Sequence, residues 1–131
     1  MEKTGGEAPK VLSVGQCDMD HRLLSGFLTR RFKAQVERAD GLADALGLLE
    51  KGDYHLVLVN RMLDMDYSPG LDVIRSLKAA DDPRVSGVPV MMVSNYPDAQ
   101  QEAVAAGAEK GFGKAELDRE ETAERLAGLF G

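Results

Sequence analysis

The residue with the clearest chemical implication is Asn60, which ends the most apolar stretch of the chain, YHLVLVN at residues 54–60. Val57, Leu58 and Val59 are consecutive there. Because successive side chains of a strand point to opposite faces, both faces of this strand must be covered. Such a strand is typical of the centre of a parallel sheet between two layers of helices. The carboxyl ends of these strands are where α/β proteins place their ligands, so we expect any functional site to include Asn60.

The residue type at that position limits the chemistry it can do. Asn60 carries a neutral amide, which is a poor nucleophile, whereas a carboxylate of the same shape could attack phosphorus and form an acyl phosphate. Ser94 ends the second buried apolar run, VPVMMVS at residues 88–94, and is expected at the same edge of the sheet. The two strand ends therefore offer an amide and a hydroxyl.

The elements that position these residues follow from hydrophobic periodicity. Strands are predicted at residues 11–15, 34–38, 54–60, 88–94 and 108–112. Apolar residues at helical spacing predict one helix after each strand. Five such pairs with right-handed crossovers indicate an α/β fold, a doubly wound five-stranded parallel sheet in the order 2-1-3-4-5, which is the flavodoxin-like (βα)5 three-layer sandwich.

Polar residues are expected to begin the first two helices. Asp18 or Asp20 is predicted to cap the first helix, and Asp40 is predicted to cap the second, because a carboxylate accepts hydrogen bonds from the free N–H groups of a first helical turn.

Length and composition indicate one domain of 131 residues, with a disordered lead-in over residues 1–9 and the folded domain over residues 10–131. The net charge of −6 and the pI near 4.9 argue against nonspecific binding to nucleic acid or to an anionic membrane. A single cysteine, Cys17, excludes an internal disulfide and fits a reducing cytoplasm. No apolar run reaches the roughly 18 residues that a membrane span needs.

Five segments carry a resemblance to a known family. They are VLSVG…DHRLLSGFL, ADGLADALGLLEKGDYHLVLVN, GLDVIRSLK, VPVMMVSN and AVAAGAEKGFGK, and in this order they span nearly all of the chain after the lead-in. Together they resemble the receiver domain of two-component response regulators, the CheY-like superfamily. The resemblance implies a phosphoacceptor aspartate after the third strand, an acidic pair that holds Mg²⁺, a Ser or Thr and a Lys that contact the phosphoryl group, and an aromatic switch residue on the last strand.

The matching positions of this sequence keep only part of that pattern. The phosphoacceptor position is Asn60, and the acidic pair falls on Gly15 and Gln16. The switch aromatic falls on Gly111. Neither Gly15 nor Gln16 supplies the carboxylate oxygens that Mg²⁺ prefers, so we predict no metal and no cofactor.

Two functional residues of the family pattern are retained, Ser94 and Lys114. Without a metal, only Lys114 would offset the charge of a transferring phosphoryl group. We expect Lys114 either to bond the side chain of Asn60 directly or to leave the pocket for Asp18, Asp20 or Asp64.

These losses together predict an atypical receiver, or pseudo-receiver: a non-enzymatic module of phosphorelay signal transduction that acts by protein–protein contact. The resemblance implies that a protein partner or a second copy would dock on the fourth helix, the last strand and the last helix, within residues 98–106, 110–114 and 117–130. We expect no binding of nucleic acid or membrane by this domain.

Two other functions compete with this interpretation. The first is an active phosphotransfer receiver in which Asp64, Asp66 or Asp18 is an off-site acceptor with Mg²⁺. The second is a flavodoxin-like cofactor binder on the same scaffold. The absence of tryptophan and the scarcity of other aromatic residues disfavour the stacking that a flavin would need.

The segment after Asn60, RMLDMDYSPG, is unusually apolar for a loop. Its large side chains are Met62, Leu63, Met65 and Tyr67. We expect them to tuck under the fold, because contiguous exposed apolar patches are uncommon in monomers, with a partner-binding patch as the alternative.

Overall fold

The computed structural model describes residues 8–130, and these form one five-stranded parallel sheet. The sheet order is β2-β1-β3-β4-β5, which confirms the predicted doubly wound topology. The strands are β1 (Lys10–Val14), β2 (Gln35–Ala39), β3 (Leu56–Asn60), β4 (Val90–Val93) and β5 (Glu109–Phe112). In the register of the centre, Val57 of β3 lies opposite Leu12 of β1 and Val90 of β4.

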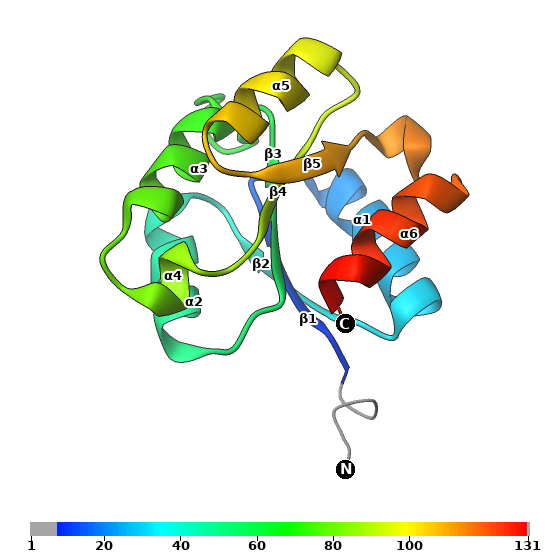
Figure 1. Cartoon of the computed structure of the whole chain (residues 1–131), viewed down its shortest axis with the longest axis horizontal. Coiled ribbons are helices and arrows are strands. Elements are labelled where there is room, and N and C mark those ends of the chain that lie inside the picture. Colours follow the sequence, from blue (N-terminus) through cyan, green and yellow to red (C-terminus); the bar gives the residue numbers. More distant parts are fainter. Residues whose placement is uncertain (1–7, 131) are drawn as a thin grey trace.

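Helices cover both faces of the sheet. The helical elements are α1 (Asp18–Phe32), α2 (Leu42–Lys51), α3 (Gly70–Ala79), α4 (Pro83–Ser86), α5 (Pro97–Ala105), the 3-10 turn η2 (Lys114–Glu116) and α6 (Glu120–Phe130). Figure 1 shows α2, α3 and α4 on one side of the sheet and α1 and α6 on the other. The five predicted helices are present, whereas the short elements α4 and η2 were not predicted.

The apolar core is split by the sheet into two halves. The alternation along β3 makes the split, because Val57 and Val59 face the half beneath α2, α3 and α5, while Leu56 and Leu58 face the half beneath α1 and α6. All four side chains are fully buried. The consecutive apolar run in β3 is therefore required by burial on both faces, as expected for a central parallel strand.

The predicted helix caps were wrong. The cap of α1 is Cys17, whose Sγ accepts a hydrogen bond from the backbone N–H of Asp20 at 3.4 Å. The cap of α2 is Gly41, which has no side chain to offer. Asp18 and Asp20 lie inside the first turn of α1, where carboxylates still interact favourably with the helix dipole.

The predicted N-terminal lead-in falls largely on residues 1–7, outside the described residues. At the edge of the described part, the carbonyl of Pro9 accepts a hydrogen bond from the backbone N–H of Gln35 at 2.8 Å, so residue 9 already belongs to the fold. Within residues 8–130, no helix has both the length and the apolar character that a membrane crossing requires.

Candidate functional site

The side chain of Asn60 joins the ends of two strands. Its amide nitrogen donates hydrogen bonds to the carbonyl oxygen of Gly15 at 3.3 Å and to that of Met62 at 2.8 Å. Both partners are acceptors, so the residue at position 60 must be a donor. An ionised carboxylate only accepts. The fold therefore uses the property of asparagine that aspartate lacks.

The first position of the expected acidic pair, Gly15, is occupied by the side chain of another residue. A Cβ atom at Gly15 would lie 2.3 Å from Cδ2 and 3.2 Å from Cα of Leu63. Leu63 comes from the loop between β3 and α3, and it is 2% exposed. The backbone of Gly15 also has a φ of +76°, in the left-handed region that favours glycine. A carboxylate at this position has neither the space nor the backbone conformation it needs.

The second position of the pair, Gln16, is enclosed by the protein. The residue is 2% exposed, and neither its amide oxygen nor its amide nitrogen has a hydrogen-bond partner among the described residues. Its backbone carbonyl accepts from the Arg38 guanidinium at 3.1 Å. Arg38 in turn pairs with Asp18 at 2.7 Å. The neutral amide of Gln16 is buried at lower cost than a charged carboxylate would be.

Lys114 pairs with Asp20. Its Nζ lies 2.5 Å from Oδ2 of Asp20, and both side chains are partly buried. Of the two arrangements expected for Lys114, the structure shows the one in which it bonds a carboxylate of the first helix. This pair uses one of the three N–H donors of the ammonium group and offsets its charge with that of Asp20.

Ser94 stabilises the turn that leads into α5. It is buried, and its Oγ accepts a hydrogen bond from the backbone N–H of Tyr96 at 3.1 Å. Its own N–H donates to the carbonyl of Phe112 at 3.0 Å, which joins the end of β4 to the end of β5.

These residues do not fit a magnesium ion. The side chains at the ends of β1 and β3 are two neutral amides and the methyl groups of Leu63, whereas proteins usually hold Mg²⁺ through one or two carboxylates. Among residues 8–130, no group of three or more His, Cys, Asp or Glu side chains could hold a metal ion. The residues at this edge of the sheet therefore do not support metal-dependent phosphoryl transfer.

Comparison with known structures finds response-regulator proteins of the same fold. No family model matches the sequence, and no curated protein is significantly similar to it. The chain is similar to the receiver domain of a DNA-binding response regulator from Colwellia psychrerythraea, with 25% identity over 92% of this chain and 98% of that one and a TM-score of 0.70. It is also similar to a response regulator from Thermotoga maritima (21% identity, 95% and 98% of the two chains, TM-score 0.73). A third similar structure is a chemotaxis response regulator from Vibrio cholerae (20% identity, 94% and 99%, TM-score 0.68).

The chain has the fold of a response-regulator receiver domain.

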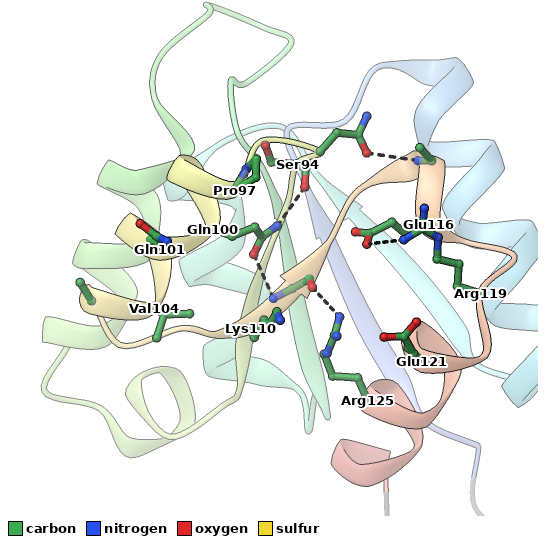
Figure 2. A pocket seen from close by; sticks show the side chains of 14 residues that line it. Ser94, Pro97, Gln100, Gln101, Val104, Lys110, Glu116, Arg119, Glu121 and Arg125 are labelled. Carbon is green, nitrogen blue, oxygen red and sulfur yellow. Dashed lines mark hydrogen bonds and ion pairs between the residues drawn. The ribbon is translucent and has the colours of Figure 1, made fainter.

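In this receiver fold, the position that matches the aromatic switch is filled from α5. A Cβ atom at Gly111 would lie 2.2 Å from the backbone oxygen of Met92, so no larger residue fits there without movement of the backbone. Gln100 fills the adjacent space. Its side-chain oxygen accepts from the N–H of Gly111 at 3.0 Å, and its nitrogen donates to the carbonyls of Met92 at 2.9 Å and Ser94 at 3.1 Å. Figure 2 shows Gln100 at the floor of a groove, with dashed lines for its bonds to Ser94 and to the strand that carries Lys110.

The groove itself lies between α5 and α6, over β5. It has a volume of about 870 Å³. Val104 and Lys110 line one part of it, and Arg119 and Arg125 line the other (Figure 2). The Arg125 guanidinium donates to the carbonyl of Gly111 at 2.8 Å, which ties α6 to β5. The three segments expected to form a docking face thus surround one concave surface.

The apolar loop after β3 divides into two parts. Leu63 is buried in the core, as expected, whereas the expectation that the other three side chains tuck under the fold was wrong: Met62, Met65 and Tyr67 are exposed. Leu63 alone of the four lies against Gly15, where its side chain occupies the space that a Cβ atom would need.

The sequence did not indicate that Leu63 occupies the space beside Gly15 or that Gln100 lies against Gly111. Leu63 is one of several apolar residues in its loop, and only the absence of a side chain at Gly15 indicates where it fits. Gln100 is a single polar residue in a helix, and no local pattern distinguishes it from its neighbour Gln101, which is exposed.

Proposed function

We propose that this chain is a pseudo-receiver: a signalling module with the receiver fold that accepts no phosphoryl group at residue 60 and acts by binding other proteins. The observation that carries the proposal is the position of Leu63. Its side chain fills the volume beside Gly15 where the family pattern has a carboxylate, so a metal-binding side chain at position 15 would collide with it. Asn60 and Lys114 support the proposal, because each is committed to another partner.

The carboxylates that could act as off-site acceptors are partly committed too. Asp18 pairs with Arg38 at 2.7 Å, and Asp66 accepts from the N–H and the hydroxyl of Ser68. Asp64 is exposed, and within residues 8–130 it forms no ion pair with a cation that could stabilise a transferred phosphoryl group. We therefore propose that none of them is phosphorylated, and that the module is not an enzyme.

The contact surface in this proposal is the face of α5, β5 and α6, used for a protein partner or for a second copy. The groove of about 870 Å³ on this face supports the proposal, since specific binding sites are concave. The mixed charge of its rim, with Lys110, Arg119 and Glu121, fits a protein surface better than a polyanion. We further propose a cytoplasmic location, which suits the single free thiol of Cys17.

The test is incubation of the chain with acetyl phosphate and Mg²⁺, followed by intact-mass measurement, with a receiver that has an aspartate at the acceptor position as a parallel control. We expect a phosphoryl mass gain on the control and none on this chain. Thermal unfolding with Mg²⁺ and a phosphoryl analogue should give the same midpoint as without them, because only a ligand that binds the folded state raises it. A stable gain that is lost in Asp64→Ala, Asp66→Ala or Asp18→Ala would instead identify an off-site acceptor.

A further inference from the structure

The loop between β3 and α3, residues 61–69, is held in one conformation by its own backbone. The N–H of Leu63 donates to the carbonyl of Ser68 at 2.9 Å, and the N–H of Tyr67 donates to the carbonyl of Leu63 at 2.8 Å. Met62 and Pro69 form an antiparallel bridge. Tyr67 has a φ of +60°, which is a rare and strained conformation for a bulky residue. These backbone contacts define the shape of the loop, and they hold Tyr67 at its positive φ.

This fixed loop presents large apolar side chains to solvent. Met62 is 42% exposed, Met65 is 63% exposed and Tyr67 is 75% exposed, within six residues of sequence. We name these three residues the Met–Tyr face. Leu63 is the buried anchor beneath it. Methionine side chains are flexible and polarisable, so they adapt to the aliphatic side chains of a partner.

Unpaired carboxylates lie beside the Met–Tyr face. Asp64 and Asp66 are exposed within the same loop. Met65 extends over the start of α2, where a Cβ atom at Gly41 would lie 3.3 Å from its Cε, and this places it next to the exposed Asp40. None of these three carboxylates has an ion-pair partner in the described part of the chain, in contrast to Asp18 and Asp20.

We propose that the Met–Tyr face is a second docking site, and that its occupant is a cationic amphipathic helix of another protein. The apolar side of such a helix would cover Met62, Met65 and Tyr67, and its Lys or Arg residues would pair with Asp40, Asp64 and Asp66. The carboxylates exclude the other occupants. Anionic lipid and nucleic acid would be repelled. A second copy would bring the same carboxylates together.

This site is separate from the face of α5, β5 and α6, and it names a partner class for the pseudo-receiver proposed above. The docking site rests on the proposed function in one respect: the loop keeps its shape because Leu63 fills the space beside Gly15. Phosphorylation of the chain would contradict the proposed function, whereas the experiment below tests the docking site alone.

The experiment is selection of a phage-displayed library of random peptides on the wild-type chain, followed by anisotropy titration of the enriched synthetic peptides. Two variants remove the site: M65S/Y67N, in which asparagine tolerates the positive φ, and D40N/D64N, which removes two charges whose side chains make no described hydrogen bond. The matched control is Leu23→Ser, which removes an apolar side chain of α1 that is 47% exposed, and Val104→Ser reports peptides that bind the groove on the other face instead. Urea unfolding midpoints check that all variants fold as the wild type does.

We expect enriched peptides with Lys or Arg and aliphatic residues at helical spacing. Their affinity should fall at least about tenfold in M65S/Y67N, because exposed contact residues at the centre of an interface carry most of its binding energy. It should also fall in D40N/D64N and at higher salt, since the charge pairs are screened. Leu23→Ser should bind as the wild type does. Enrichment of acidic peptides, sensitivity to Val104→Ser instead of M65S/Y67N, or no enrichment over a surface without the chain would each overturn the proposal.

Discussion

Asn60 and Gly15 differ from the receiver pattern in a coupled way. Asn60 donates to the carbonyl of Gly15, and that carbonyl also accepts from the N–H of Asp64 at 2.9 Å. The small residue at position 15 admits Leu63, and the donor at position 60 fixes the loop that carries Leu63. A carboxylate at either position would break this arrangement, so the two substitutions support each other physically.

The space at Gly15 can be tested by Gly15→Ala. We expect a loss of unfolding free energy on the order of 2–4 kcal/mol, because the new methyl group collides with Leu63 and the backbone is left-handed. The matched control is Gly47→Ala in α2, where a Cβ meets nothing within 4 Å, and this variant should be unchanged or more stable by up to about 1 kcal/mol. Urea unfolding measures both. The double variant G15A/L63A should lose less unfolding free energy than the sum of the losses in G15A and L63A. A loss equal to that sum would show that Leu63 is not the obstacle.

The donor role of Asn60 can be tested by Asn60→Asp. This variant places a carboxylate against the carbonyls of Gly15 and Met62, and we expect it to lose about 1–3 kcal/mol of stability near neutral pH. The control is Asn95→Asp, since Asn95 accepts a hydrogen bond from the N–H of Ala115 through its side-chain oxygen, which aspartate also supplies. Equal urea midpoints for the two variants would refute the assignment of Asn60 as a donor.

At the scale of elements, one side chain connects three of them. Gln100 of α5 bonds the carbonyl of Met92 in β4, the carbonyl of Ser94 directly after β4, and the N–H of Gly111 in β5. The register between β4 and β5 shifts at this point, between the pairs Met91–Glu109 and Val93–Phe112, and the ladder there leaves backbone groups that need a partner. Gln100 supplies that partner and at the same time closes the space at Gly111. In this chain the edge of the sheet is bound to α5 without a rotating aromatic side chain.

Gln100→Ala should therefore destabilise the chain by about 1–3 kcal/mol, because three backbone groups in a partly buried place lose their hydrogen bonds. The neighbouring Gln101→Ala is the control, and we expect a change within about 0.5 kcal/mol, as is usual for exposed positions. Hydrogen exchange gives a second measurement, in which the amide of Gly111 should exchange faster in the first variant alone. A protected Gly111 amide in Gln100→Ala would mean that β5 is held by other contacts.

For the molecule as a whole, pH acts through groups that are partly buried in the fold. The pKa of His21 lies below its ordinary value of 6.5, first because burial disfavours the charged ring and second because of the positive charge of Arg38, with Asp18 opposing both. Its Nδ1 is buried with no partner among residues 8–130. The pKa of Glu37 is lowered chiefly by the hydrogen bond from the Tyr54 hydroxyl at 2.7 Å.

These shifts set the sign of the pH dependence. The unfolded chain binds the His21 proton more tightly than the folded chain does, so stability should fall as pH drops through about 6.5. A further loss from Glu37 should follow below about 4.5, because its folded form favours the carboxylate. Urea unfolding between pH 7.5 and 5.5 should show the first loss in the wild type and little of it in His21→Gln. An equal slope in both proteins would exclude His21 as its source.

What the sequence by itself determined is the fold class and the residue types at the ends of the strands. Residues 56–60 could only be a doubly covered strand, and the strand order followed from the alternation of strands and helices, because burial patterns and right-handed crossovers are local properties of the chain. The identity of residue 60 as an amide likewise needed no coordinates.

The tertiary structure decided which side chains lie against the residues at the strand ends. Three such contacts join residues from different parts of the fold: Leu63 with Gly15, Lys114 with Asp20, and Gln100 with Gly111. Which side chain occupies an emptied volume depends on the shape of that volume, and only the packed fold defines it.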